Sequence, residues 1–184
     1  RDKGKKYVED ILAADPKNAQ AVAFKGLVQY NEKNYDGALK YANQSIKLNS
    51  MGYIPYLVIY KVYRAQNRLA LAIDTIDAAI KKNPANEKLR NLLLKLYYEK
   101  KDFAKVALQL EALIKLNPDE TRYDKVLVSV YTLMGDKVKA RNALEAKIKR
   151  HPKAHKHKLE LANFINSHFG HADAGRVYGP ENVA

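Results

Sequence analysis

The chain has 184 residues, a formal net charge of +13 at pH 7 and no cysteine. The lack of cysteine excludes disulfide bonds and thiolate metal sites. No segment approaches the run of about 18 apolar residues that a membrane span requires, and the hydrophobic fraction of 47% is that of an ordinary folded protein. We therefore expect a soluble protein, cytoplasmic or periplasmic, with the balance toward an exported bacterial protein.

Prolines recur on a 34-residue grid, at Pro16, Pro84, Pro118 and Pro152, and the remaining position of the grid is Ser50. An aspartate, asparagine or histidine precedes each grid position. Because proline disfavours the α conformation in the residue before it, and Asp and Asn accept turn geometry, each position predicts a helix end. A fixed period of about 20–50 residues is typical of solenoids, in which each unit covers the apolar face of the next.

Between the grid positions, apolar residues recur at steps of three and four, as in Leu89, Leu92, Leu93 and Leu96. This periodicity predicts helices. Each unit also has a break near its middle, such as Lys33-Asn34, where Asn or Asp can cap a second helix. In chain order, the predicted helices span residues 2–14, 19–32, 35–48, 53–66, 69–82, 87–100, 103–116, 121–134, 137–150 and 155–168.

This pattern resembles a tandem array of tetratricopeptide repeats over residues 1–168. With repeats counted from Ala19, Tyr53, Glu87 and Thr121, the small residue that the family expects at position 8 corresponds to Gly26. The family's aromatic position 11, alanine position 20 and proline position 32 hold Tyr63, Tyr97 and Tyr131; Ala38, Ala72 and Ala140; and Pro84, Pro118 and Pro152. The resemblance implies an all-α solenoid of antiparallel helix pairs that forms a right-handed superhelix.

The repeat register predicts three parts of the chain. Residues 1–16 would be the second helix of a truncated repeat, residues 17–152 four tetratricopeptide repeats, and residues 153–184 a degenerate terminal repeat or cap. We therefore expect the sequence to be a piece of a longer protein. Open solenoid ends expose apolar side chains that commonly pair, so self-association is expected through Val8, Ile11 and Leu12 at one end and Phe164, Ile165 and Phe169 at the other.

The resemblance also implies a concave groove lined by the first helix of each repeat. The groove positions carry basic residues with apolar and tyrosine insertions, which suits an acidic extended segment of a protein or peptide partner. We therefore expect an interaction scaffold without enzymatic activity. The alternative interpretation is that the lysines form only a solvated helix surface. The predicted groove residues are Phe24, Leu27, Leu57, Lys61, Arg64, Lys88, Leu92, Lys95, Tyr98, Arg122 and Lys125.

A second hypothesis comes from residues 137–158, which contain nine lysines and arginines against one glutamate, a net charge of +8. This basic segment favours non-specific binding of nucleic acid or another polyanion. Its surface would be formed by Lys147, Lys149, Arg150 and Lys153. In a third hypothesis, the array is the targeting arm of an enzyme that lies outside this sequence.

Catalytic, cofactor and metal sites are not predicted. The sequence contains no glycine-rich phosphate loop, nucleophile elbow or paired-carboxylate pattern. His151, His155 and His157 invite a metal interpretation because imidazoles four residues apart can share a helical face. No set of neighbouring carboxylates or thiols completes such a site, and we favour a solvated basic surface instead.

Overall fold

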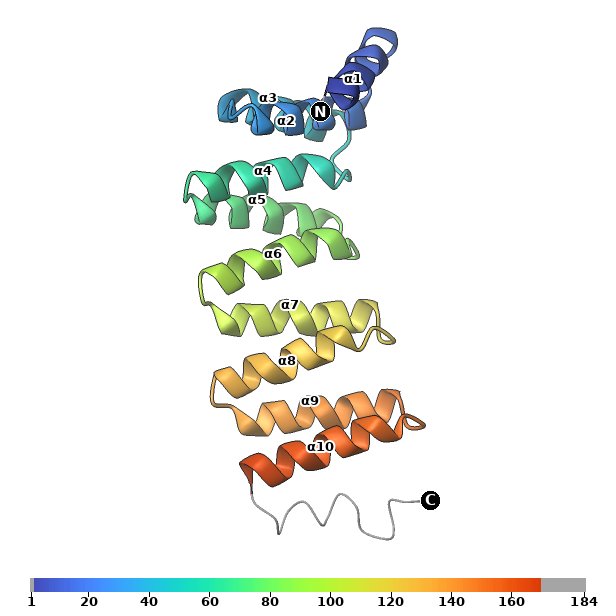
Figure 1. Ribbon diagram of the computed structural model, residues 1–184, viewed down its shortest axis with the longest axis vertical. Coiled ribbons are helices and arrows are strands. Elements are labelled where there is room, and N and C mark those ends of the chain that lie inside the picture. The colour runs from blue at the N-terminus through green and yellow to red at the C-terminus, as the bar shows by residue number, and fades with distance from the viewer. Residues whose placement is uncertain (1, 170–184) are drawn as a thin grey trace. The chain divides into compact units, whose positions relative to one another are not determined.

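A computed structural model describes residues 2–169 of the chain. All regular secondary structure in that range is helical (Figure 1). The chain divides into two compact units, Arg1–Lys100 and Lys101–Ala184. Unit 1 contains α1 (Asp2–Ala14), α2 (Ala19–Asn31), α3 (Tyr35–Leu48), α4 (Ile54–Ala65), α5 (Leu69–Lys82) and α6 (Glu87–Glu99). Unit 2 contains α7 (Phe103–Leu116), α8 (Arg122–Leu133), α9 (Lys137–Arg150) and α10 (His155–His168).

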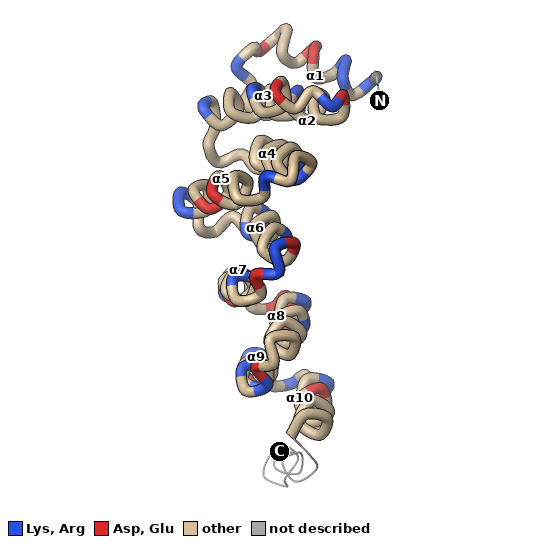
Figure 2. Tube along the Cα trace, turned by 90° about the vertical axis from the view of Figure 1, so that its left-hand side faces the viewer, with Lys and Arg blue, Asp and Glu red and all other residues tan. Residues whose placement is uncertain are grey.

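Each predicted helix is present, with both ends within one residue of the predicted range. In unit 1, α2 packs against α3 and α4 against α5, and in unit 2, α8 packs against α9. The prediction of an all-α solenoid of helix pairs is confirmed. The even-numbered helices are the first helices of their repeats; in Figure 2, α8 and α10 lie on one side of unit 2 and α7 and α9 on the other.

Asparagine and aspartate side chains begin many of these helices. Asn18 and Asn86 cap first helices by accepting hydrogen bonds from the backbone N–H three residues later, and Asn34, Asp102 and Asp136 cap second helices in the same way. These contacts satisfy backbone donors that a helix start leaves free. The predicted mid-repeat caps are thus confirmed at three breaks, whereas α5 begins after a residue that makes no side-chain cap.

The turn between the two helices of a repeat uses a left-handed residue at the same repeat position each time. Lys33, Asn67, Lys101 and Gly135 have φ values of 60°, 56°, 58° and 76°. Glycine adopts this region freely, whereas a residue with a β carbon does so at a cost in free energy. Only one of the four is glycine. In the turns at Lys33 and Asn67, the next backbone N–H donates back to a carbonyl oxygen of the first helix, from Asn34 to Gln29 and from Arg68 to Tyr63, and these hydrogen bonds hold the turn.

Small residues allow the two helices of the first repeat to approach closely. A β carbon added to Gly26 of α2 would lie 3.2 Å from the carbonyl oxygen of Ala38 in α3, and Ala38 is fully buried. The family positions 8 and 20 therefore act here as the sequence predicts. None of the helices between residues 2 and 169 is both long and apolar enough to cross a membrane.

The core of unit 2 corrects one sequence prediction. Leu144 of α9 and Leu161 and Ile165 of α10 form a buried cluster, against which Phe164 packs. Ile165 has no exposed surface, so it cannot belong to an apolar patch open for self-association. Its side chain faces α9 because α10 packs on α9 as a first helix packs on the preceding second helix.

Candidate functional site

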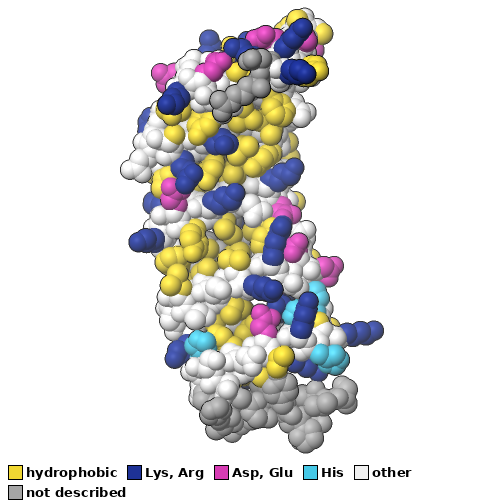
Figure 3. Space-filling model, in the orientation of Figure 1, with side chains coloured by type: hydrophobic (Ala, Val, Ile, Leu, Met, Phe, Trp, Pro, Cys, Tyr) yellow, Lys and Arg dark blue, Asp and Glu magenta, His cyan; other side chains and the backbone are white. Residues whose placement is uncertain are grey.

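The candidate partner-binding site is the face formed by the first helices of unit 1, namely α2, α4 and α6, which we call the first-helix face. α4 packs against both α2 and α6, so the three helices form one continuous surface. Phe24 and Tyr98 are exposed on it, by 37% and 53%, and Leu27 and Leu57 are half-buried. Figure 3 shows yellow hydrophobic side chains interspersed with dark blue lysine and arginine side chains over these helices.

A hollow of about 250 Å³ joins the three helices near their C-terminal ends. Its lining includes Tyr30 of α2, Lys61 and Arg64 of α4 and Glu99 of α6. Lys61 Nζ lies 5.2 Å from the centroid of the Tyr30 ring, and Arg64 Nε lies 2.9 Å from Glu99 Oε2. Burial raises the pKa of Tyr60, another lining residue. The carboxylate of Glu99 balances the charge of Arg64, whereas the ammonium of Lys61 lies over the Tyr30 ring.

A second hollow, of about 310 Å³, lies toward the N-terminal ends of the first helices. It is lined by Ser45, Tyr53 and Lys88 among others. Lys88 Nζ of α6 lies 5.7 Å from the centroid of the Tyr53 ring, which stands at the start of α4. Burial, and next the charge of Tyr60, raise the pKa of Tyr53. Both hollows thus combine a lysine of one first helix with a tyrosine from the preceding one.

Leu92 does not belong to this face, contrary to the sequence prediction. It is 2% exposed, and its neighbours Leu89, Leu93 and Leu96 are buried as well. The wide apolar stripe of α6 is needed because α6 packs against both α4 and α5. Val58, which holds the same repeat position in α4, is also fully buried. Lys95 and Lys88, by contrast, are exposed.

Arg122 and Lys125, the remaining predicted groove residues, lie in α8 of unit 2 and are exposed. Arg122 donates a hydrogen bond to the Tyr123 hydroxyl at 2.9 Å, and its guanidinium lies 4.8 Å from the centroid of that ring. The candidate site is therefore defined on unit 1 alone, from the eight predicted residues that remain accessible on α2, α4 and α6.

Lys147 does not belong to the alternative basic surface, contrary to the sequence prediction. Lys147 has no exposed surface, and its Nζ donates to Glu160 Oε2 of α10 at 2.7 Å. The reason is its repeat position, which is also buried when it holds Ser45, Ala79 or Leu113. Lys147 is thus a buried member of the α9–α10 contact and cannot bind a polyanion.

Arg150 is also engaged within unit 2. Its guanidinium pairs with Asp124, which is 1% exposed, and donates to the carbonyl oxygen of Pro118 at 3.0 Å. Lys149 and Lys153 remain exposed. The proposed polyanion surface therefore retains two of its four predicted cations in accessible form.

His157 is buried beside the Lys147–Glu160 ion pair. It is 3% exposed, and its Nδ1 lies 3.7 Å from Glu160 Oε2 without a hydrogen-bond partner among the described residues. Burial, and next the nearby positive charge of Lys147, lower the pKa of His157. Among residues 2–169, no three His, Cys, Asp or Glu side chains are grouped so as to hold a metal ion; His171 lies outside the described residues.

We predict that acid destabilises unit 2 through His157. Because the pKa of His157 is lower in the folded chain, the unfolded chain binds the proton first. The stability that unit 2 has with a neutral His157 is thus fully present above the unfolded pKa of about 6.5. It is lost as the pH falls below that value. Urea unfolding between about pH 8 and pH 5 should show a flatter pH dependence for His157→Gln than for the wild type. His155→Gln, at an exposed histidine of the same helix, should keep the wild-type dependence; identical profiles for all three proteins would contradict the prediction.

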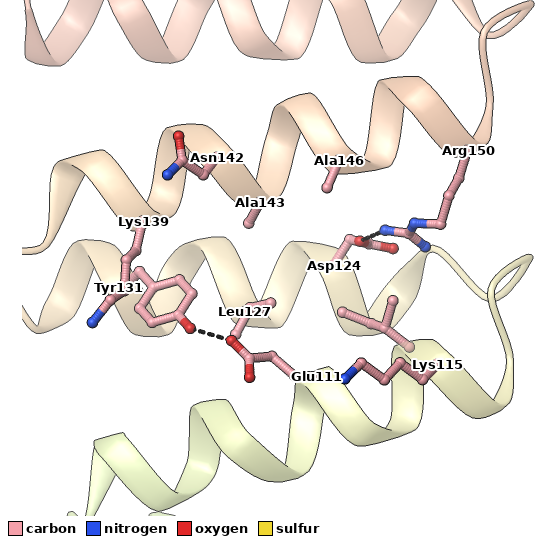
Figure 4. A pocket seen from close by; sticks show the side chains of 11 residues that line it. Glu111, Lys115, Asp124, Leu127, Tyr131, Lys139, Asn142, Ala143, Ala146 and Arg150 are labelled. Atoms are coloured by element: carbon pink, nitrogen blue, oxygen red, sulfur yellow. Dashed lines mark hydrogen bonds and ion pairs between the residues drawn. The ribbon is translucent and has the colours of Figure 1, made fainter.

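Sequence reasoning missed a pocket of about 500 Å³ in unit 2, between α7, α8 and α9 (Figure 4). Two second helices line it, so it is separate from the first-helix face. The sequence feature that could have indicated this pocket is the small side chain of Ala143 in α9. The same repeat position holds the larger Tyr41, Thr75 and Gln109 in α3, α5 and α7.

The repeated helix pairs define a helical-repeat protein. A family model described as Tetratricopeptide repeat matches residues 1–50 and 61–121, and the chain belongs to this family. Tetratricopeptide repeats generally serve as interaction scaffolds without enzymatic activity. No curated protein sequence matches the chain.

Solved structures of similar fold include several repeat proteins. A chain in the structure of Naa15/Naa10 bound to HypK-THB matches with a TM-score of 0.65 and 20% identity, over 98% of this chain and 28% of that chain. YrrB, described as a TPR protein with an unusual peptide-binding site, matches with a TM-score of 0.59 and 14% identity over 92% and 88%. A thermophilic TPR protein in Thermus thermophilus matches with a TM-score of 0.54 and 18% identity over 86% and 87%. The chain thus spans little more than a quarter of the Naa15/Naa10 neighbour, and at these identities the likeness concerns the fold.

Proposed function

We propose that the chain is a protein-interaction scaffold that binds an extended acidic segment of a partner on the first-helix face of unit 1. The observation that carries the proposal is the repeated lysine-over-tyrosine arrangement, with Lys61 over Tyr30 and Lys88 over Tyr53. A tyrosine ring holds the ammonium by cation–π attraction and leaves its N–H donors available. Each arrangement presents a positioned cation beside an apolar surface, which suits a glutamate or aspartate next to an apolar residue.

Charge alone is too weak to hold such a segment. Each exposed ion pair contributes about 0.2–1 kcal/mol, so Lys61, Lys88 and Lys95 together would supply at most about 3 kcal/mol. Micromolar affinity requires about 8 kcal/mol. The rest must come from apolar contacts, for which Phe24 and Tyr98 are the exposed aromatic side chains on this face. Aromatic residues supply much of the binding energy at interfaces, so the partner must combine acidic with apolar residues.

We predict that a labelled peptide of alternating glutamate and leucine binds unit 1 of the intact chain, and that the same peptide with glutamine in place of glutamate binds at least about tenfold more weakly. Reversing two charges on the face, in Lys61→Glu with Lys88→Glu, should slow association and reduce the salt dependence. Tyr98→Ala should instead speed dissociation. Fluorescence anisotropy and stopped-flow kinetics measure these quantities.

A matched control has the same change of charge away from the face. Lys40 and Lys47 are exposed on the second helix α3, and Lys40→Glu with Lys47→Glu should bind the peptide nearly as well as the wild type. Equal losses in the two double variants would mean that only net charge matters, which contradicts a defined site. Loss of binding on reversal of Lys149 and Lys153, with no loss on reversal of Lys61 and Lys88, would favour the polyanion hypothesis instead.

A further inference from the structure

The pocket between α7, α8 and α9, which we call the second-helix pocket, has the size of a small-molecule site. Its volume of about 500 Å³ lies within the range of about 300–1,000 Å³ that is usual for such sites. α7 and α9 form its walls and α8 its floor (Figure 4). The pocket follows α8 from Asp124 to Tyr131, a rise of about 10 Å, and is therefore longer than a single side chain.

The middle of the second-helix pocket is apolar. Leu127 of α8 is 5% exposed and forms part of the floor, Ile114 of α7 lies on one wall, and Ala143 and Ala146 lie on the other. Space is left in this middle part because the two α9 residues that line it are alanines. A ligand with an apolar body would fill this part by displacing water from apolar surface.

Polar groups lie toward the two ends of the pocket, and most are already engaged. At one end, the Tyr131 hydroxyl donates to Glu111 Oε1 at 2.5 Å. At the other end, Arg150 pairs with Asp124. Each carboxylate thus has a donor from the protein itself, and neither is a free anchor for a cationic ligand.

Two lysines complete the charged lining. Lys139 Nζ lies 3.1 Å from Asp136 Oδ2, which balances its charge. Lys115 is also charged and lines the pocket. Within residues 2–169, the structure gives it no hydrogen bond or ion pair, unlike the other charged lining residues. The polar groups left for a ligand are therefore the exposed Lys115 ammonium and the exposed Asn142 amide, and the ammonium favours an anionic head group.

We propose that the second-helix pocket binds a small amphiphilic carboxylate, with its apolar body along Leu127, Ala143 and Ala146 and its carboxylate at Lys115. The pocket length suits an unbranched chain of about eight carbons, comparable to the rise of α8 along the floor. This site is independent of the first-helix face and would bind its ligand whether or not a peptide occupies unit 1.

The test uses three probes and the intact chain. Octanoate has both the chain and the charge, 1-octanol has the chain alone, and acetate has the charge alone. In methyl-resolved NMR titrations, octanoate should give saturable shifts of the Leu127, Ala143 and Ala146 methyl signals. 1-Octanol should shift the same signals with about two- to fivefold weaker affinity, the amount that one exposed ion pair contributes, and acetate should not shift them.

Two variants and a matched control locate the site. Ala146→Leu fills the pocket from an exposed position and should weaken octanoate binding at least about tenfold. Lys115→Gln should weaken octanoate about two- to fivefold and leave 1-octanol unchanged. Ala78→Leu introduces the same side chain at the same repeat position of α5, also exposed, and should bind octanoate as the wild type does. Circular dichroism confirms that each variant keeps its helical content.

Three results would overturn the proposal. The first is the absence of saturable shifts with octanoate. The second is wild-type octanoate affinity in Ala146→Leu. The third is equal affinity for octanoate and 1-octanol together with an unchanged Lys115→Gln, since the ligand would then not be recognised as a carboxylate.

Discussion

Glu160→Gln is expected to destabilise unit 2 by about 3 kcal/mol, near the lower end of the range for breaking a buried ion pair. Lys147 has no exposed surface, and the substitution leaves its ammonium without a counter-charge. Glu160 itself is 37% exposed, so water reaches part of the pair and the loss stays below the upper end of the range. Hydrogen exchange of amides in α9 and α10 would measure the change as faster exchange.

A substitution of Lys147 tests whether the loss of stability in Glu160→Gln comes from the uncompensated ammonium. Lys147→Met places an apolar residue at a position that holds Leu113 in the preceding repeat, and replacing a buried charge by a well-packed apolar side chain is often neutral or stabilising. We expect Lys147→Met to lose less than about 1 kcal/mol and to abolish the effect of Glu160→Gln in the double variant. A large loss in Glu160→Gln that persists beside Lys147→Met would contradict this explanation.

Ile165→Ala is expected to cost about 2–5 kcal/mol of unfolding free energy, because it removes buried methyl and methylene groups and leaves a cavity beside Leu144 and Leu161. Urea unfolding monitored by circular dichroism would measure the cost. Leu159→Ala is the control on the same helix, since Leu159 is 57% exposed and should change the free energy by less than about 0.5 kcal/mol. Equal effects of the two substitutions would mean that α10 does not pack on α9 as described.

The helices were predictable because local signals and the repeat agree. Proline or serine follows each second helix at a fixed interval, and the side chains of Asn34, Asp102 and Asp136 cap the second helices α3, α7 and α9. The turn at Lys33 and Lys101 could be located but its left-handed geometry could not be derived from lysine. That geometry is accompanied by backbone hydrogen bonds across the turn, such as the one that Asn34 N–H donates to the Gln29 carbonyl oxygen at 2.9 Å.

The candidate site was only partly predictable, for a physical reason. Family positions identify the face of a helix on which a residue lies. Burial also depends on how many neighbouring helices pack against that helix, and Leu92 is buried because α6 packs against both α4 and α5. Counting charges placed Lys147 on a basic surface, although Ser45, Ala79 and Leu113 at the same position already indicated a buried site. The second-helix pocket arises from missing side-chain volume at Ala143, which no motif of polar residues marks.

The pairing of Lys147 with Glu160 also restricts which helices can dock together. Repeat arrays can misassemble because their units are alike, for example by a slip of one repeat. At the same two positions, the other junctions between repeats carry Ile11 and Phe24, Ser45 and Val58, Ala79 and Leu92, and Leu113 and Val126. Docked on α2, α4, α6 or α8, α9 would place the ammonium against a phenylalanine, valine or leucine, which leaves the charge uncompensated. Of the first helices that the structure describes, α10 supplies the carboxylate that α9 needs, so this single ion pair opposes a slip of the array by 34 residues during folding.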